Sequence, residues 1–350
     1  MKTKRKDSNL LYLKLRNIIY ERVFCGDYRN GELIPTEREL AQKYRMSRIT
    51  VRSTLEMLEK EGFVTRVQGR GTAIDLKLKS TKTDMGIIGV VAPNRIPFFS
   101  QFIELFNEKA EANDSLVLLK TQTQNKDQNI EKYLFKLFVK NIRNVVIWSY
   151  GSNLDPELIY RLRGMGMNFV FFDIVDDIRY GDGVCLDNKD GLETLYSHAL
   201  SEIRNNRKIA YIGWDNLAIS SVNERETTFR KASKGESPVF HVRWANRWQY
   251  RSDLVEILKG LKKNMPDCLI CVNSEIGIET KKILNEMGFS RVLVCCIDDD
   301  AEAKDLGVIT YDQPMEQMAS KVYDCLQNQN QKTSDWRPKA FRLKGKISKN

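Results

Sequence analysis

The chain has 350 residues, which is long for one compact core, so we expect two or three domains. A hydrophobic fraction of 42% and a charged fraction of 29% describe a soluble globular protein. No apolar run approaches the roughly 20 residues that a transmembrane helix needs. The basic N-terminus leads into an amphipathic segment rather than a secretory signal, so we expect a cytoplasmic protein with no membrane partner.

The net charge of +10 is concentrated at the N-terminus. The first 80 residues hold 18 Lys and Arg against 10 Asp and Glu, whereas the other 270 residues hold 38 against 36. A small basic head therefore precedes a nearly neutral body. This asymmetry indicates a module that binds a polyanion, attached to a part with another task.

Three helices are predicted in the head. Residues 10–24 repeat apolar side chains at three- and four-residue steps, as an amphipathic helix does. A second helix begins after Thr36, whose hydroxyl can form a capping box with Glu39. A third helix begins after Ser47, a good N-cap, and ends near Gly62.

A hairpin is predicted directly after the third helix. Two β-rich runs flank the segment Gln68-Gly69-Arg70-Gly71, and its glycines permit the positive φ of a tight turn. Three helices followed by a hairpin is the order of a winged helix-turn-helix. We therefore assign residues 1–76 to a DNA-binding domain and residues 77–84, which are polar and charged, to a linker.

The third helix combines an apolar back with a cationic front. Val51, Leu55 and Leu58 follow helical spacing and would face the core, while Arg48 and Arg52 lie four residues apart on another face. Arginine forks in the major groove can pair with guanine O6 and N7. The alternative is a solvated charged helix, but helix order, capping, hairpin and local charge together favour DNA recognition.

These segments also resemble the DNA-binding domain of GntR-type regulators. The resemblance rests on IPTEREL, MSRITVR, LEMLEKEGF and VQGRGT, in this order, within residues 10–75. It implies a dimer that reads two half-sites of a palindromic operator. It also implies DNA contacts by residues of the second helix, the third helix and the wing, and with the cap Ser47 the candidate set is Arg38, Ser47, Arg48, Thr50, Arg52, Gln68, Gly69 and Arg70.

The body, residues 85–350, alternates strand-like and helix-like segments. Apolar runs such as GIIGVVA, NVVIW and DCLICV are separated by helical stretches that include 99–112, 188–203 and 274–287. This alternation is typical of a parallel α/β sheet, and the length suits two lobes. No glycine-rich phosphate loop appears, which argues against a nucleotide ligand.

Ligands of such folds bind beyond the carboxyl ends of the strands. Aromatic, Asp and Asn side chains follow several of the predicted strands, among them Phe99, Trp148, Asp173, Asp187, Asn273 and Asp298. Rings stack on sugar C–H groups, while carboxylates and amides bind hydroxyls. Each of these residues has a plainer alternative, because a strand-terminal Asp or Asn is often a helix cap and an aromatic residue can be core.

The body resembles the effector domain of LacI-type repressors, which is similar to periplasmic sugar-binding proteins. The resemblance rests on segments such as IGVVAPNRIPFF, VCLDNKDG, NERETTF and VLVCCIDDD. It implies a two-lobed hinge fold with a monosaccharide in the cleft and no cofactor. The candidate ligand-binding residues, including Trp148 from its place after a strand, are Phe99, Trp148, Asp187, Arg225, Asn273 and Asp298. Arg225 could instead pair with a carboxylate across the cleft.

Together the two resemblances predict a repressor whose operator binding is controlled by a small carbohydrate. The arrangement is similar to that of the arabinose repressor family. The alternative is a metal-dependent enzyme acting on a phosphorylated sugar, with Asp298, Asp299, Asp300 and Glu275 holding Mg²⁺. No phosphate loop and no nucleophile–histidine constellation accompany those carboxylates, so we expect no catalytic and no metal site.

A zinc site is the other metal alternative. Cys268, Cys271, Cys295 and Cys296 form a C-x-x-C and a C-C pair. Both pairs lie in short apolar runs that read as buried strands, and cysteine is among the residues most often buried. We therefore expect core positions rather than zinc ligands.

Overall fold

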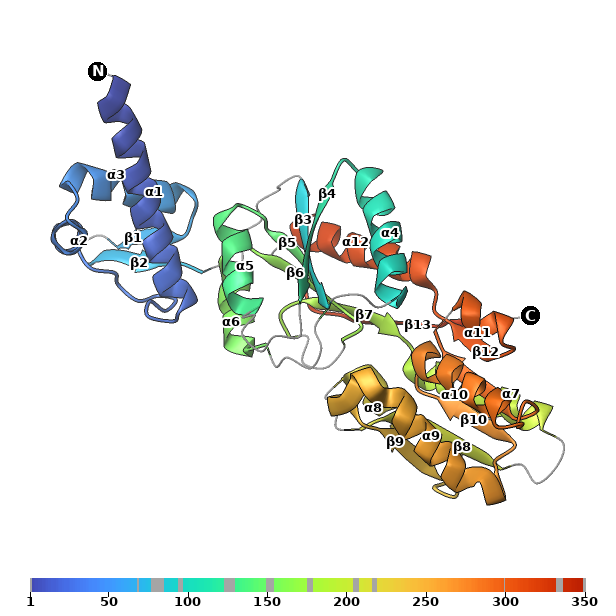
Figure 1. Cartoon of the computed structure of the whole chain (residues 1–350). Helices are drawn as coiled ribbons and strands as arrows, with labels where there is room; N and C mark the ends of the chain where they lie inside the picture. The colour runs from blue at the N-terminus through green and yellow to red at the C-terminus, as the bar shows by residue number, and fades with distance from the viewer. Residues whose placement is uncertain are drawn as a thin grey trace.

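The computed structural model describes residues 2–67, 69–76, 85–93, 97–122, 130–148, 154–174, 179–203, 208–215, 219–298, 300–331 and 336–348. Side chains are described for all of these except residues 2–10, 93, 97, 98, 122 and 246–248. A helical head is followed by two α/β lobes, each built on its own sheet (Figure 1). This confirms the predicted fold class. The predicted linker, residues 77–84, lies outside the described residues.

The head has three helices and a two-stranded antiparallel wing. Their bounds are α1 (Lys2–Phe24), α2 (Glu37–Tyr44), α3 (Arg48–Lys60), β1 (Val64–Val67) and β2 (Gly71–Ile74). The predicted capping box is present, since Thr36 N donates to Glu39 Oε2 at 2.7 Å and Glu39 N donates to Thr36 Oγ1 at 3.3 Å. Ser47 caps α3 through the backbone N–H of Thr50. The order and the caps confirm the winged helix-turn-helix prediction.

The turn between α2 and α3 lacks the glycine that such turns often contain. Arg45 takes the left-handed conformation there, with φ 53° and ψ 46°, and its N–H reaches back to the carbonyls of α2. A non-glycine residue costs roughly 1 kcal/mol in this conformation. The packing of Leu40, Val51 and Leu55 in the head core, each at most 2% exposed, holds the turn in place despite this cost.

The first lobe is a parallel sheet with helices on both faces. Its strands run in the order β13-β7-β6-β5-β3-β4, with bounds β3 (Ile87–Pro93), β4 (Leu116–Gln122), β5 (Asn144–Ile147), β6 (Asn168–Phe172), β7 (Asp182–Leu186) and β13 (Ala340–Leu343). Two helices, α4 (Pro97–Glu111) and α12 (Met315–Gln331), cover one face. The other face carries α5 (Ile130–Val139) and α6 (Pro156–Gly164), which lie next to the head (Figure 1).

The second lobe repeats this plan. Its strand order is β14-β12-β11-β10-β8-β9, with bounds β8 (Ile209–Trp214), β9 (Val239–Val242), β10 (Cys268–Cys271), β11 (Leu293–Ile297), β12 (Ile309–Asp312) and β14 (Lys346–Ile347). Only β14 is antiparallel to its neighbour among these described strands. The helices are α7 (Asn188–Glu202), α8 (Ser220–Ala232), α9 (Tyr250–Leu261), α10 (Ser274–Glu286) and α11 (Ala301–Asp305), with short 3₁₀ turns at Trp244–Gln249 and Lys262–Asn264.

The four cysteines of the C-x-x-C and C-C pairs are core residues, as predicted. All four lie in β10 or β11 and are 0% exposed. Burial raises the pKa of the Cys271 and Cys296 thiols, which keeps them protonated and unreactive.

The chain passes between the lobes three times, and one tyrosine ties the passages together. It crosses after β7, after β12 and after β13. Tyr311 Oη, at the β12 crossing, donates to Asp190 Oδ2 of α7 at 2.6 Å and accepts from Gly345 N at 2.9 Å. Gly345 leaves no space for a side chain, since a Cβ there would lie 2.1 Å from Asp312 O. The crossings therefore form one compact hinge.

Within the described residues, no helix combines the length and the apolar character needed to cross a membrane.

Candidate functional site

Helix α3 buries one side and leaves the other open, as its sequence predicts. Val51 and Leu58 are fully buried in the head core, whereas Ile49 is 80% exposed and Arg48 and Arg52 are exposed beside it. These arginines are free of the head's own core and can enter a groove. We call the described candidates the reading surface, which comprises the exposed Arg38, Ser47, Arg48, Arg52, Gly69 and Arg70 and the half-buried Thr50.

Hydroxyl groups order the start of α3. Ser47 Oγ accepts from Thr50 N at 3.1 Å and lies 2.8 Å from Thr50 Oγ1. The positive end of the helix dipole and the free N–H groups of the first turn favour a phosphate at this position. Ser47 and Thr50 are thus held together at the end of α3 that would approach DNA.

A carboxylate on α2 holds one of the arginines. Arg52 Nη2 lies 3.1 Å from Glu37 Oε2, and Arg52 Nε lies 3.3–3.4 Å from both carboxylate oxygens. Hydrogen bonding to Glu37 raises the pKa of Arg52. Both side chains are partly or largely exposed, so the pair fixes direction more than it adds stability. Glu37 was not among the predicted site residues, although the sequence places it in the first turn of α2.

The wing presents Arg70 at the tip of a tight turn. Gly69 has φ 71°, and Arg70 N donates to Val67 O at 2.9 Å, which closes the turn. The exposed Arg70 side chain lies beside two glycines, so a backbone of another molecule can approach closely. Gln68, the remaining wing candidate, lies outside the described residues. Arg38 is exposed on α2.

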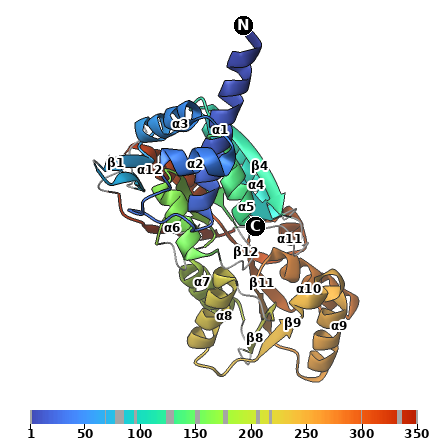
Figure 2. The same ribbon diagram turned by 90° about the vertical axis from the view of Figure 1, so that its left-hand side faces the viewer.

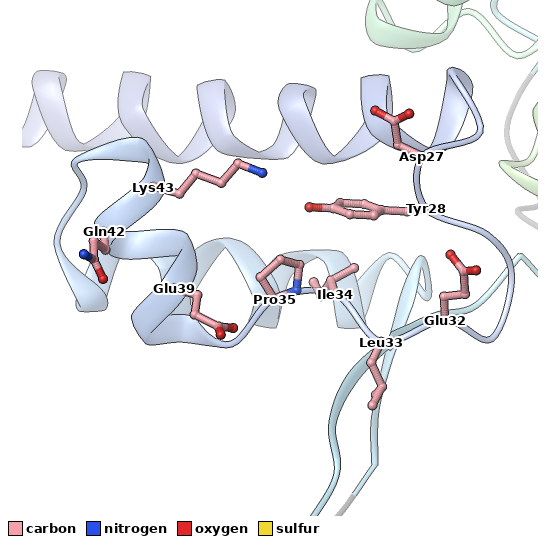
Figure 3. A pocket seen from close by; sticks show the side chains of 9 residues that line it. All are labelled: Asp27, Tyr28, Glu32, Leu33, Ile34, Pro35, Glu39, Gln42 and Lys43. Carbon is pink, nitrogen blue, oxygen red and sulfur yellow. The ribbon is translucent and has the colours of Figure 1, made fainter.

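A groove between α1 and α2 has the opposite charge. It encloses about 900 Å³ and is lined by Asp27, Tyr28, Glu32, Leu33, Ile34, Pro35, Glu39, Gln42 and Lys43. Figure 3 shows Tyr28 and Lys43 in the space between the two helices, with the carboxylates of Asp27 and Glu32 at one end. Three carboxylates against one ammonium group repel phosphate. This groove is therefore a poor surface for DNA.

In the body, two aromatic candidates lie together at the carboxyl ends of β3 and β5. The ring centroids of Phe99 and Trp148 are 5.2 Å apart, and Phe172 meets Trp148 edge-on at 5.8 Å. Phe99 is 5% exposed and Trp148 is 6% exposed. These rings close the apolar core of the first lobe just below the junction with the second lobe.

Asp173 extends from the same edge toward the second lobe. It has φ 57°, and its N–H donates to Val184 O at 2.9 Å. Oδ2 accepts from Ser221 Oγ of α8 at 3.3 Å, while Oδ1 is buried with no hydrogen-bond partner among the described residues. Burial raises the pKa of Asp173 to about 6, and the positive charge of Arg225 opposes that rise. An unpaired buried acceptor is costly unless a ligand donates to it.

Arg225 is buried and held by protein acceptors. Its Nε donates to Asn188 Oδ1 and its Nη1 donates to Val272 O, both at 2.8 Å. Two roles were predicted for Arg225, binding the ligand or pairing with a carboxylate across the cleft. The only sign of the second role is that the charge of Arg225 lowers the pKa of Asp173. The preceding residue of α8, Glu224, accepts from Arg342 Nη1 at 2.8 Å, which joins β13 of the first lobe to the second.

The three remaining polar candidates stand after strands: Asp187 follows β7 of the first lobe, and Asn273 and Asp298 follow β10 and β11 of the second. Asp187 and Asn273 are helix N-caps: Asp187 Oδ1 accepts from Asp190 N at 3.0 Å, and Asn273 Oδ1 accepts from Ile276 N at 3.2 Å. The plainer alternative, a helix cap, therefore accounts for the Oδ1 atom of each side chain. Asp298 has φ 91° and accepts from Gln313 Nε2 at 2.5 Å. Gln313 Oε1 is a second buried acceptor without a partner among the described residues.

These residues form what we call the interlobe site. We give this name to the polar residues at the strand ends and crossings near the lobe junction: Asp173, Asp187, Asn188, Ser221, Arg225, Asn273, Asp298 and Gln313. Hydrogen bonds join Asp173 to Ser221, Arg225 to Asn188 and Asp298 to Gln313, and the charges of Arg225 and Asp298 act on Asp173. Asp173 stands at a predicted strand end but was not a predicted ligand contact, and Gln313 was not predicted because it lies on a crossing between the lobes. The described residues contain no group of three His, Cys, Asp or Glu side chains placed to hold a metal ion. Asp299, one of the carboxylates considered for Mg²⁺, lies outside them.

Comparisons with known proteins agree with this division. Residues 11–74 match the model of bacterial regulatory proteins of the gntR family, and residues 203–342 match the periplasmic binding protein-like domain. The arabinose metabolism transcriptional repressor of Geobacillus stearothermophilus is 24% identical over 290 residues, covering 80% of this chain and 78% of that protein. The proteins similar to this chain are transcription regulators rather than enzymes, so the metal-dependent enzyme is set aside.

Solved structures resemble the body. A LacI family regulator from Enterococcus faecium with bound ribose has a TM-score of 0.62 at 17% identity, covering 75% of this chain and 97% of that one. A lac repressor dimer bound to operator has a TM-score of 0.63 at 14% identity, covering 77% and 94%. At these identities the likeness shows the fold, a two-lobed periplasmic-binding-protein-like domain.

The raised pKa of Asp173 predicts a pH dependence of stability. Its pKa of about 6 in the folded chain exceeds the ordinary value of 3.8. The folded state then binds the proton more tightly, so this residue lowers stability as pH rises from about 4 to 6, by roughly 2–3 kcal/mol in total. Asp173→Asn should remove this decline and raise the free energy of unfolding at pH 7, measured by urea unfolding across that range.

Asp114→Asn is the matched control. Asp114 also has a positive φ, 57°, but it is exposed, and Asn accepts this conformation. If wild type and Asp173→Asn lose stability in parallel between pH 4 and 6, the carboxyl is not buried as described.

Proposed function

We propose that this chain, a transcription regulator that joins a GntR-type helix-turn-helix domain to a periplasmic-binding-protein-like domain, is a repressor whose operator binding is controlled by a monosaccharide. The observation that carries this proposal is the pairing of an exposed cationic helix face with a polar interlobe site that has unpaired acceptors. It acts on double-stranded DNA and therefore in the cytoplasm.

The reading surface supports a base-reading role. Arg48 and Arg52 leave α3 on one side, and Glu37 directs the Arg52 guanidinium, so a fork is prepared for a guanine edge. Ser47, Thr50 and Arg70 supply hydroxyl and cationic contacts to phosphate, which set the register. Arg38 and Gln68 complete the proposed contact set.

The interlobe site favours a neutral ligand rich in hydroxyls. Its unpaired groups, Asp173 Oδ1 and Gln313 Oε1, are acceptors, and a sugar hydroxyl is a donor. Its arginines already donate to acceptors of the protein, Arg225 to Asn188 and Val272 and Arg342 to Glu224, which leaves fewer donors for a phosphate. We extend the contact set to Phe99, Trp148, Asp187, Asn273 and Asp298. The related arabinose repressor makes L-arabinose the first sugar to test.

An exposed apolar sheet edge supports a homodimer. Strand β4 is at the edge of the first lobe, and Leu116, Leu118 and Leu119 are 64%, 41% and 41% exposed, next to Ile87 at 44%. Such an edge tends to pair with another chain unless it is covered. A two-fold contact here would bury it in both copies and would place two heads on one duplex.

Control by the sugar requires different affinities for two arrangements of the lobes. Contacts that bridge the lobes, Ser221 to Asp173 and Arg342 to Glu224, are the ones that change if the lobes rotate about the Tyr311 hinge. Operator half-sites lie about 34 Å apart or at multiples of that distance. A small rotation therefore changes how well two heads fit.

Replacing a base-reading arginine should weaken specific binding. Arg48→Ala should cost about 1–3 kcal/mol of affinity for an operator selected from a random duplex library, and less on random duplex. Fluorescence anisotropy at fixed salt measures both affinities. Arg251→Ala on α9 is the control. Arg251 pairs with Glu279 and Glu286 in the second lobe, so its replacement should leave both affinities unchanged. An equal loss on operator and random duplex would exclude base reading by Arg48.

Replacing Asp298 should remove the sugar response while operator binding persists. We expect L-arabinose, or another member of a panel of monosaccharides and sugar phosphates, to raise the melting temperature of the wild type, because a ligand bound only to the folded state stabilises it. Asp298→Ala should abolish this shift, since its carboxylate accepts hydroxyl donors. Asp305→Ala, at an exposed site on α11, should keep it. A full shift in Asp298→Ala would place this residue outside the site, and no shift with any sugar would refute the ligand class.

A further inference from the structure

The head is not separate from the first lobe but shares a hydrophobic core with it. Leu15, Ile19 and Val23 of α1 belong to the same buried cluster as Leu134 and Phe138 of α5. Both views place α1 beside α5 and above α6 (Figures 1 and 2). We call this contact the docking interface, formed by the second half of α1 and Leu76 on one side and by α5 and α6 on the other.

Aromatic rings carry the central part of the docking interface. Tyr20 meets Phe63 of the head and Phe138 of the lobe edge-on, each at 4.7 Å between ring centroids. Phe24 packs on Phe135 at 4.6 Å. Such pairs stabilise a contact beyond the area they bury. Tyr20 therefore joins two cores with one ring.

Polar contacts tie the interface to the end of the reading helix. Tyr20 Oη donates to Glu61, the C-cap residue of α3, and Arg16 lies 3.4 Å from the same carboxylate. From the lobe, Arg161 Nε donates to Phe24 O at 3.2 Å and so caps the last turn of α1. The orientation of α3 is thus connected to α1, and α1 is held by the lobe.

The last described residue of the head, Leu76, also packs tightly against the first lobe. Leu76 lies against Gly164 at the end of α6, where a Cβ would come within 2.9 Å of Leu76 Cβ and 3.0 Å of Leu76 O. Only glycine accepts this approach without a shift. The docking interface therefore holds the head at two places, at α1 and at Leu76.

The docking interface is continuous with the interlobe site through two strands. Arg143 lies 3.9 Å above the Phe138 ring and precedes β5, which is followed at its carboxyl end by Trp148. Helix α6 leads into β6, which is followed at its carboxyl end by Asp173. One sheet therefore connects the head, at the amino ends of these strands, with the candidate sugar contacts at their carboxyl ends.

We propose that the docking interface makes the head and the first lobe one rigid unit, so that the arrangement of the lobes in a dimer sets the distance between the two reading helices. This inference rests on the proposed function, specifically on a dimer that reads two half-sites. Tyr20, Phe24, Phe135 and Gly164 are positioning residues: they touch no DNA, and they determine where the DNA-reading residues stand.

A tethered head would behave differently. A flexible segment of eight residues, the length of 77–84, spans about 16 Å on average, so undocked heads could adapt to several half-site spacings. A docked head cannot. One inserted base pair shifts a half-site by about 3.4 Å and rotates it by roughly 35°, which a rigid pair of heads does not follow.

The test compares operators of different spacing. The selected operator, with zero, one or two base pairs inserted between its half-sites, is titrated with the full-length wild type, Phe24→Ala, Phe135→Ala and Gly164→Ala by fluorescence anisotropy. Phe24 and Phe135 are only half-buried, so their truncation leaves the cores of both parts largely intact. Tyr133→Ala on the same helix α5 is the control, because its ring faces Lys120 of β4.

We expect one inserted base pair to weaken wild-type and Tyr133→Ala binding by at least about tenfold, and to weaken binding by the three interface variants by less than about threefold. Affinity for a single half-site should be equal in all five proteins. Wild-type tolerance of the insertion would overturn the inference, and so would an unchanged spacing penalty in the interface variants. A wild type that selects no operator at all would instead overturn the proposed function.

Discussion

Helix α1 is buried on two sides, and the orientation of α3 with its exposed arginines depends on this double burial. One side contributes Leu15, Ile19 and Val23 to the core beneath α3, and another places Tyr20 and Phe24 against α5 of the first lobe. A helix that packs against only one neighbour would leave the second side in water. Here α3 is oriented by its own core and, through Tyr20 and Glu61, by the body as well.

The interlobe site has the character of an incomplete hydrogen-bond network. Asp173 and Gln313 each keep a buried oxygen without a described partner, while the nearby arginines are satisfied. The pKa of Asp173 is raised because its carboxylate is removed from water before a donor arrives. A ligand that supplies donors from both sides gains most when the lobes close on it. Under the proposed function, the same contacts bind the sugar and select an arrangement of the lobes.

Sequence alone predicts the head well because its signals are local. Thr36 and Glu39 lie three residues apart, and Gly69 must take a positive φ within one turn. The parallel sheets follow from alternating strand and helix patterns. Arg342 and Glu224, by contrast, are 118 residues apart, and neither lies at a predicted strand end.

The docking interface shows the same limit. Tyr20 and Phe24 fit the apolar period of an amphipathic helix, and nothing in that period says that their partners are Phe138 and Phe135. The Arg45 turn, where glycine is usual, adopts the left-handed conformation because the tertiary packing of α2 and α3 requires it. Sequence patterns indicate that a face is buried, whereas the identity of its partner is a property of the whole fold.

The central claim is that the cationic head recognises a particular duplex sequence and that the body decides when it does so. The most direct test is the ratio of dissociation constants of the full-length protein for its selected operator and for a scrambled duplex of equal length and composition, at one salt concentration. The account predicts a ratio of about 10³ or more in one state of the body, with or without L-arabinose or an active member of the sugar panel, and a markedly smaller ratio in the other. A ratio below about tenfold in both states would contradict it.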